Sequence, residues 1–185
     1  MADERIAFTF GYEGPGKPIP PGGSLVTITV TPIPSGTRLQ LRHVVGAEQI
    51  RDDHVRGWRY QLARFASVVA DDVFAGAADR CAAWFTAWSA DDPRSALAAI
   101  VTDDVRFRDG NGDSYGLDEL VEHVTAVRRF MPGVRLEPRG VPRRSHDVAI
   151  ADWAIVDPAG AVRQTGSNVV RFASDGRIAD VVAVT

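Results

Sequence analysis

The chain has 185 residues, of which 45% are hydrophobic, so it can bury one ordinary core or two small ones. Its net charge of -3 gives no basic surface for nucleic acid, and no apolar run reaches the ~20 residues that span a bilayer. Cys81 is the only cysteine, which excludes an intrachain disulfide and a thiolate zinc site; with a polar start that lacks signal-peptide features, this predicts a cytoplasmic protein.

The first part of the chain has the pattern of an antiparallel meander. Apolar and polar residues alternate over residues 6–10, 25–31 and 38–44, which is typical of strands with one buried face. Four prolines within residues 14–23 indicate a loop, since proline cannot donate in a β-ladder. Over residues 51–69 the apolar spacing changes to steps of three and four, which predicts one long helix across the meander. Its apolar stripe is Val55, Trp58, Leu62, Phe65 and Val69.

Four segments of this part carry a family likeness. They are Phe10-Gly11-Tyr12-Glu13, the Thr-rich strand over residues 25–31, Gly36-Thr37-Arg38-Leu39, and Gly57-Trp58 followed by Leu62. These segments resemble the C-terminal half of the START-like, helix-grip superfamily, in particular its heat-shock-protein ATPase activator homologues. The resemblance implies a partial helix-grip unit over residues 1–70, without the N-terminal helix and further strands that would complete its cavity.

A second α+β part is predicted over residues 78–185, after a linker at residues 71–77. Cys81, Trp84, Phe85 and Trp88 recur at i, i+3, i+4 and i+7, which predicts an amphipathic helix with an aromatic stripe facing a core. Asp92-Pro93 then supplies an N-cap residue and a proline at the first helical position, so a short helix is expected to start there.

The remainder of this part alternates strands with one helix. Val105 and Phe107 lie on the same face of a strand that ends in a turn over residues 109–113. A helix is predicted over residues 117–130. Strands follow over residues 147–156, 161–172 and 177–184, and a shorter strand fits residues 134–138.

A second family likeness covers essentially all of this part. Its segments are Trp88-Ser89-Ala90-Asp91-Asp92, Asp103-Asp104-Val105-Arg106-Phe107-Arg108-Asp109, Gly116-Leu117-Asp118-Glu119-Leu120, Asn168-Val169-Val170-Arg171-Phe172 and Asp175-Gly176-Arg177-Ile178. They resemble the nuclear transport factor 2-like fold, and closely its SnoaL-like polyketide cyclase branch. The resemblance implies a cone built from a curved antiparallel sheet with helices. The whole chain is therefore predicted to be α+β, with a three-stranded meander and one long helix preceding the cone.

Two side chains are the main candidates for chemistry. Asp109 shares strand parity with Val105 and Phe107, so its carboxylate should face the apolar interior, where it could act as a general base. Asn168 is in phase with Val170 and should face the same side. In the ketosteroid isomerase relatives the matching positions hold the proton-shuttling aspartate and an acid that binds the substrate oxyanion, so the resemblance implies related roles here. Alternatively, Asp109 only builds a polar turn and Asn168 is a buried amide satisfied by backbone.

Two further residues are weaker candidates. His123 lies on the helix over residues 117–130 and could enter the pocket as an acid or base, or remain on the surface. Tyr115 could cover the mouth of the cavity or simply pack on it. The predicted pocket wall consists of Trp84, Trp88, Phe107, Tyr115, Val124 and Phe172. The isomerase tyrosine has no counterpart, because the first helix of this part offers Trp84, Phe85 and Trp88 instead.

These patterns lead to a functional hypothesis. We expect a protein whose C-terminal cone binds an apolar small molecule, as a cofactor-independent isomerase or cyclase with Asp109 as the base and Asn168 steadying the enolate. The alternative is a non-catalytic ligand-binding or dimerisation module. No cofactor, metal, nucleic acid or membrane partner is expected, because HExxH, GxGxxG, GxSxG and P-loop patterns are missing and the four histidines lack ligand spacing.

The incomplete helix-grip unit also predicts an oligomeric state. Three strands leave two sheet edges, and one helix leaves much of the inner face uncovered. Either the second part of the chain or a second copy covers them, and nuclear transport factor 2-like domains commonly dimerise through their sheets. A homodimer that buries Phe8, Phe10 or Trp58 is therefore expected.

Overall fold

A computed structural model describes residues 4–34, 36–46 and 48–185. The chain divides into two compact units at Phe65 and Ala66. Both units combine helices with antiparallel strands, which confirms the predicted α+β class. Among the described residues, no helix is both long and apolar enough to cross a membrane.

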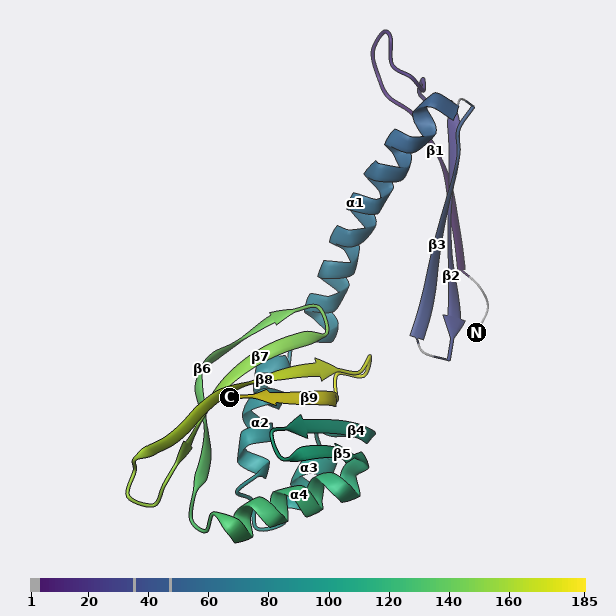
Figure 1. Cartoon of the computed structure of the whole chain (residues 1–185). Helices are drawn as coiled ribbons and strands as arrows, with labels where there is room; N and C mark the ends of the chain where they lie inside the picture. The colour runs from purple at the N-terminus through teal and green to yellow at the C-terminus, as the bar shows by residue number, and fades with distance from the viewer. Residues whose placement is uncertain (1–3, 35, 47) are drawn as a thin grey trace. The chain divides into compact units, whose positions relative to one another are not determined.

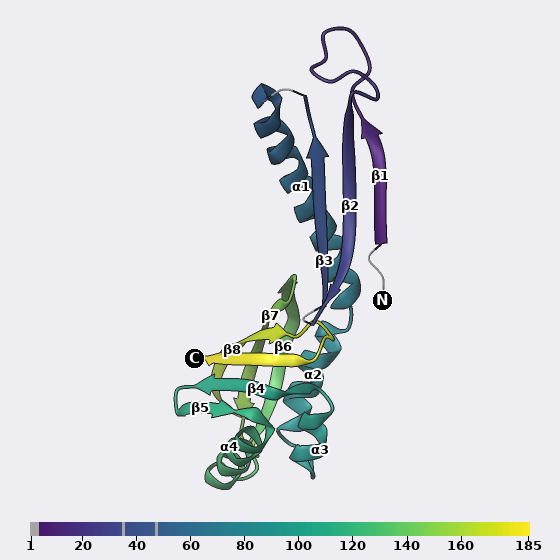
Figure 2. The same ribbon diagram turned by 90° about the vertical axis from the view of Figure 1, so that its right-hand side faces the viewer.

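The first unit contains a three-stranded antiparallel sheet in the order β1-β2-β3 (Figures 1 and 2). Its strands are β1 (Glu4–Phe10), β2 (Ser24–Ile33) and β3 (Gly36–Val44). Ile6 pairs with Ile28 and Ile28 pairs with Leu41, so the alternating apolar residues share one face. The predicted meander is therefore confirmed.

One long helix, α1 (Glu48–Val73), follows this sheet. Within the first unit it contacts the sheet through an aromatic cluster, whose ring centroids lie 5.1 to 6.1 Å apart. The cluster consists of Phe10, Tyr12, His43, His54 and Trp58. On the helical stripe, Trp58 and Leu62 are half-buried, whereas Phe65 is exposed. The expected packing across the meander is thus realised only over the first part of the helix.

A chain of hydrogen bonds fixes the tautomer of His43 in this cluster. Trp58 Nε1 donates to His43 Nδ1 at 3.0 Å, and Ser24 Oγ donates to the carbonyl oxygen of Phe10 at 2.8 Å. Because the Ser24 proton is already used, His43 Nε2 is the donor in its 2.8 Å contact with Ser24 Oγ. His43 is therefore neutral here. Burial and, to a smaller extent, the neighbouring His54 lower its pKa.

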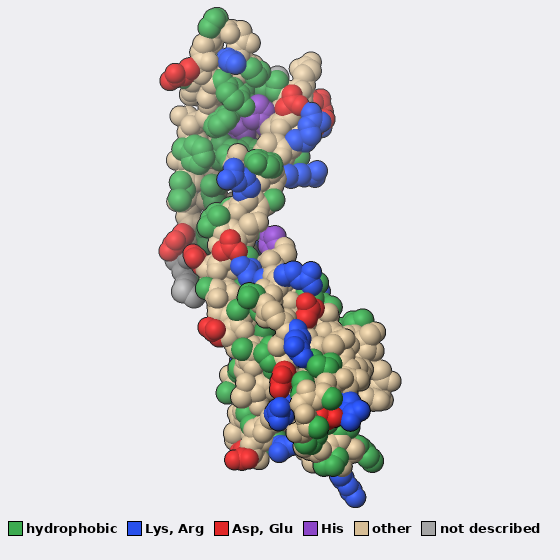
Figure 3. Space-filling model, turned by 90° about the vertical axis from the view of Figure 1, so that its left-hand side faces the viewer, with side chains coloured by type: hydrophobic (Ala, Val, Ile, Leu, Met, Phe, Trp, Pro, Cys, Tyr) green, Lys and Arg blue, Asp and Glu red, His purple; other side chains and the backbone are tan. Residues whose placement is uncertain are grey.

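Apolar side chains are visible on the surface of the first unit (Figure 3). Its exposed large apolar residues include Ile6, Leu25 and Leu39. Of the residues expected at a dimer interface, Phe10 and Trp58 pack in the aromatic cluster and Phe8 is exposed. The homodimer stays a prediction.

The second unit is built on a six-stranded sheet in the order β5-β4-β9-β8-β7-β6 (Figure 1). Its strands are β4 (Val101–Asp109), β5 (Gly112–Tyr115), β6 (Arg135–Ser145), β7 (Val148–Val156), β8 (Val162–Phe172) and β9 (Ile178–Val184). Neighbouring strands are antiparallel except β4 and β9, which pair in parallel. Phe107 and Val170 both pair with Val181, so one row of residues crosses three strands on the same face.

Three helices complete the second unit: α2 (Ala77–Ala87), α3 (Pro93–Ala98) and α4 (Gly116–Phe130). The predicted stripe of α2 is confirmed, since Cys81, Trp84 and Phe85 are buried in the core. Burial raises the pKa of the Cys81 thiol to about 11. The predicted start of α3 is also confirmed, because the Asp92 side chain accepts a hydrogen bond from the backbone N–H of Ser95.

Two strands differ from the sequence-based expectation. The turn after β4 is part of a β-hairpin, in which Asp109 pairs with Gly112 of β5. β6 extends to Ser145, far beyond the short strand that fits residues 134–138. It is an edge strand with a bulge between Arg139 and Arg143, so its prolines and charged residues are tolerated there although they conceal the strand pattern.

Residues 71–77 do not form a separate linker. α1 continues to Val73, and a short turn leads to α2 at Ala77. Ala70 and Phe74 lie in the core of the second unit, where the Phe74 ring is 6.0 Å from that of Phe172. The last turns of α1 therefore belong to the second unit, which explains why the division falls before Ala66 instead of after residue 70.

The first prediction concerns the pH dependence of the first unit. The pKa of His43 is lowered in the folded state from its ordinary value of 6.5. The stability that neutral His43 contributes is therefore fully present above pH 6.5 and is lost as the pH falls further. Arg51, Arg59 and His54 line the same hollow and add positive charge against the imidazolium. We expect hydrogen exchange in β2 and β3, corrected for intrinsic rates, to show less protection at pH 5 than at pH 7.

His43→Gln is the matched control, because an amide keeps one acceptor and one donor but does not titrate in this range. Protection in that variant should change much less between the two pH values. An equal loss of protection in wild type and His43→Gln would exclude His43 as the cause.

Candidate functional site

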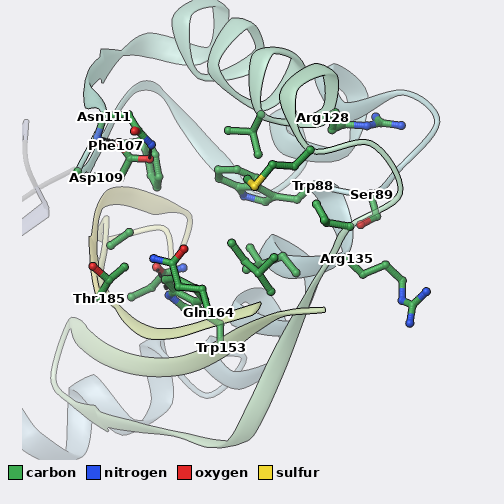
Figure 4. Close-up of a pocket in the computed structure, with 18 residues that line it drawn as sticks. Trp88, Ser89, Phe107, Asp109, Asn111, Arg128, Arg135, Trp153, Gln164 and Thr185 are labelled. Carbon is green, nitrogen blue, oxygen red and sulfur yellow. Dashed lines mark hydrogen bonds between the residues drawn. The ribbon is translucent and has the colours of Figure 1, made fainter. Parts of the chain in front are cut away.

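A pocket of about 290 Å³ opens in the second unit between α4 and one face of the sheet (Figure 4). This volume is at the small end of the roughly 300–1,000 Å³ typical of small-molecule sites. Its apolar wall consists of Trp88, Phe107, Val127, Met131, Val134, Leu136, Trp153, Ile155 and Ala183. Its polar side chains are those of Ser89, Asp109, Asn111, Arg128, Arg135, Gln164, Asn168 and Thr185. The pocket therefore suits a small, mainly apolar molecule with a few polar atoms.

Asp109 lies at the end of β4 and lines this pocket, with its side chain 15% exposed. Its Oδ1 accepts hydrogen bonds from the backbone N–H groups of Asn111 and Gly112, at 2.8 and 3.1 Å. Its Oδ2 accepts a longer bond of 3.3 Å from Asn111 Nδ2. The polar-turn interpretation is therefore confirmed through Oδ1, whereas the role of Asp109 as a base stays a prediction.

His123, on α4, lies beside Asp109. Its Nε2 is 3.1 Å from Asp109 Oδ2, and its side chain is 16% exposed. The ring also packs on Phe107, with 5.0 Å between centroids. The Nε2 atom is nevertheless buried without a hydrogen-bond partner in the described part of the chain, so the contact with Asp109 is close but not aligned for a hydrogen bond. His123 is not part of the pocket wall; it touches the candidate base from outside the pocket.

Asn168 lies on β8 and also lines the pocket, although it is only 2% exposed. Trp153 Nε1, from β7, donates to Asn168 Oδ1 at 3.0 Å. An indole nitrogen can only donate, so this bond orients the amide and leaves its Nδ2 as the donor available to a ligand. The oxygen of the buried amide is thus satisfied by a side chain, Trp153, instead of by backbone.

Asp109 on β4 and Asn168 on β8 lie on the same face of the sheet, with one strand, β9, between them. The strand order is β4-β9-β8, and Phe107 and Val170 both pair with Val181. Asp109 is two residues after Phe107 and Asn168 is two residues before Val170, so both side chains lie on the same face as these residues. Adjacent strands lie about 4.8 Å apart, which separates the two backbones by roughly 10 Å.

The other predicted wall residues are distributed differently. Trp88 and Phe107 line the pocket as expected. Trp84, Val124 and Phe172 are buried in the closed core and do not contribute to the wall. Tyr115 is 55% exposed; its ring lies under the Arg106 guanidinium, 4.9 Å away, and its hydroxyl donates to Asp113. Tyr115 therefore does not cover the pocket.

Sequence reasoning missed Trp153, which orients Asn168, and the residues that enter from β6 and the end of α4. Trp153 had an accessible signal, because it shares strand parity with the small buried residues Ala149 and Ala151. The wall from β6 had no such signal, since that strand was itself concealed by its composition. Within the described residues, no three metal-ligating side chains converge.

The second unit is thus a curved sheet packed against helices, with a pocket that is lined by a carboxylate and an amide. The SnoaL-like domain model matches residues 81–181, which is more than half of the chain. The chain therefore belongs to the SnoaL-like family. A second model, activator of Hsp90 ATPase homolog 1-like protein, matches residues 1–70.

A solved structure of the SnoaL-like family shows the same fold for the second unit. A candidate isomerase of the SnoaL-like family from Agrobacterium tumefaciens str. C58 is 24% identical, with a TM-score of 0.53, covering 55% of this chain and 89% of that one. A candidate polyketide cyclase from Sinorhizobium meliloti is 21% identical, with a TM-score of 0.49, covering 57% and 93%. No curated protein matches the chain. Identities this low show the fold alone.

The second prediction tests the support beneath Asn168. A Cβ at Gly166 would lie 2.3 Å from the carbonyl oxygen of Val184 and 2.5 Å from Cζ2 of Trp153. Gly166→Ala must therefore displace the Trp153 ring and weaken its bond to Asn168. We expect the free energy of unfolding to fall by about 1–3 kcal/mol in chemical denaturation.

Gly57→Ala is a matched control in α1, because no atom lies within 4 Å of its added Cβ. That variant should gain roughly 0.5–1 kcal/mol from the better helix propensity of alanine. A neutral or stabilising effect of Gly166→Ala would show that Trp153 is not held by close contact with this glycine.

Proposed function

We propose that the second unit binds a small, mainly apolar carbonyl compound and moves a proton next to its carbonyl group without a cofactor. The observation that carries this proposal is the placement of the Asp109 carboxylate and the Asn168 amide in one pocket. A base and a hydrogen-bond donor on the same face are the two groups that enolate formation requires. The membership of the SnoaL-like family supports the same class of substrate.

The proposed step uses each side chain for one task. Asp109 Oδ2 accepts the proton from the carbon next to the carbonyl, and the C–H electron pair forms a carbon–carbon double bond. The carbonyl π electrons move to oxygen, which becomes an enolate oxygen and accepts a hydrogen bond from Asn168 Nδ2. Return of the proton from Asp109 to a different carbon completes an isomerisation. Attack of the enolate carbon on a second carbonyl would instead close a ring and restore the first carbonyl, and the proton held by Asp109 would then go to the new alkoxide oxygen.

The alternative is a non-catalytic binding module, and one observation favours it. Asp109 Oδ1 already caps the hairpin turn through Asn111 and Gly112, so the carboxylate has a structural role that requires no reaction. In that case the pocket would bind its ligand without turnover. The two functions differ in whether substrate protons exchange with solvent.

The third prediction is therefore kinetic. Exchange of the α-protons of cyclohex-3-enone with D₂O, and its conversion to cyclohex-2-enone, should be catalysed by the wild type and followed by NMR. Asp109→Asn removes the proton acceptor, so its rate should fall by about 10²–10⁴-fold. Its affinity for the ketone should stay within about tenfold, or ~1.4 kcal/mol, because the amide keeps the size and polarity of the carboxylate.

Asp113→Asn is the matched control, since Asp113 belongs to the same hairpin but pairs with Arg106 outside the pocket wall. Its rate should equal that of the wild type. Equal rates in wild type and Asp109→Asn would exclude Asp109 as the base. Binding without exchange in the wild type would favour the non-catalytic alternative.

A further inference from the structure

The pocket contains a second unused hydrogen-bond donor besides Asn168. Trp88 follows the last residue of α2 and lines the pocket, yet its Nε1 is buried and makes no hydrogen bond within the described part of the chain. The indole nitrogen can only donate. A buried N–H without an acceptor costs roughly 1–3 kcal/mol, so its retention in a pocket wall calls for an acceptor that is supplied from outside the chain.

The ring of Trp88 is held by aromatic contacts on several sides. Its centroid lies 5.9 Å from that of Trp84, 5.6 Å from that of Phe107 and 6.0 Å from that of His123. These contacts restrict the ring, so its N–H has a defined direction before a ligand enters. Donors that are oriented in advance are the kind that stabilise a developing negative charge without reorganisation.

The other indole nitrogens of the chain serve as comparisons. Trp58 Nε1 and Trp153 Nε1 each have an acceptor, on His43 and Asn168 respectively. Trp84 Nε1 has none in the described residues, but Trp84 lies in the closed core and not in the pocket wall. Trp88 therefore combines a buried N–H that has no acceptor in the described residues with a side chain that lines the pocket.

We propose that Trp88 is a catalytic residue, whose Nε1–H donates to the enolate oxygen together with Asn168 Nδ2. This inference rests on the proposed function and deepens it: the substrate must carry a carbonyl oxygen that both donors can reach while Asp109 faces the adjacent carbon. The indole N–H then acts as the second donor to the enolate oxygen, since α2 contains no tyrosine hydroxyl that could do so. Met131, a flexible and exposed side chain of the pocket wall, can move to admit the ligand.

The experiment uses 4-nitrophenolate, a planar conjugated oxyanion that resembles an enolate. It is titrated into ¹⁵N-labelled Asp109→Asn protein, because the neutral amide stands in for the protonated aspartate that accompanies the enolate. The four tryptophans give four indole N–H signals, which are assigned from the backbone without further variants. The Trp88 proton should move downfield on binding, as expected for a new hydrogen bond to an anion, and the Trp84 proton should not.

Affinity supplies an independent readout. Adding Trp88→Phe to Asp109→Asn removes the donor and should weaken 4-nitrophenolate binding about ten- to a hundredfold, the range for hydrogen bonds to charged groups. Trp58→Phe in the same background removes an indole N–H that does not line this pocket and should leave the affinity unchanged. Binding with no shift of the Trp88 signal and no loss in Trp88→Phe would overturn the role of Trp88. Failure of 4-nitrophenolate to bind would also overturn it, whereas the role of Asp109 is judged separately by proton exchange.

Discussion

The hydrogen bond from Trp153 to Asn168 determines what the pocket offers a ligand. Since the indole can only donate, Asn168 Oδ1 must turn toward it, and the amide N–H₂ is left for the pocket. An amide with the opposite orientation would present an oxygen, which repels an enolate. The Trp153 ring fits in its position because Gly166 has no side chain; a Cβ there would lie 2.5 Å from the ring. Gly166 on β8 and Trp153 on β7 thus determine which group of the Asn168 amide faces the pocket.

The sheet order places the Asp109 carboxylate relative to that donor. β9 runs parallel to β4 and antiparallel to β8, and it separates Asp109 from Asn168 by one strand on a common face. Asp109 is positioned further by its own turn, because the N–H groups of Asn111 and Gly112 hold Oδ1 and leave Oδ2 as the less strongly bound oxygen. The structural and the proposed catalytic use of this carboxylate are therefore compatible, since they involve different oxygens.

Strand parity was sufficient to predict that Asp109 and Asn168 lie on the pocket side, because alternation assigns each residue to a face. Parity does not say how far along that face the core closes, which is why Trp84, Val124 and Phe172 proved to be core residues and not wall residues. The length of β6 was hidden because an edge strand with a bulge tolerates proline and charge. The Trp153 bond depends on which strands become neighbours, and a single sequence does not contain that information. The spacing of apolar residues predicted helix α1. That the last turns of this helix belong to the second unit follows only from the burial of Ala70 and Phe74 in its core.

In the proposed function, one pocket presents a base to a carbon atom and donors to the adjacent oxygen. A crystal structure of the full chain with 4-nitrophenolate tests it most directly. We expect the phenolate oxygen within hydrogen-bond distance of Asn168 Nδ2, the ring between Trp88 and Trp153, and a ring carbon facing Asp109. A phenolate oxygen bound instead by Arg128 and Arg135, with the ring directed away from Asp109, would contradict it.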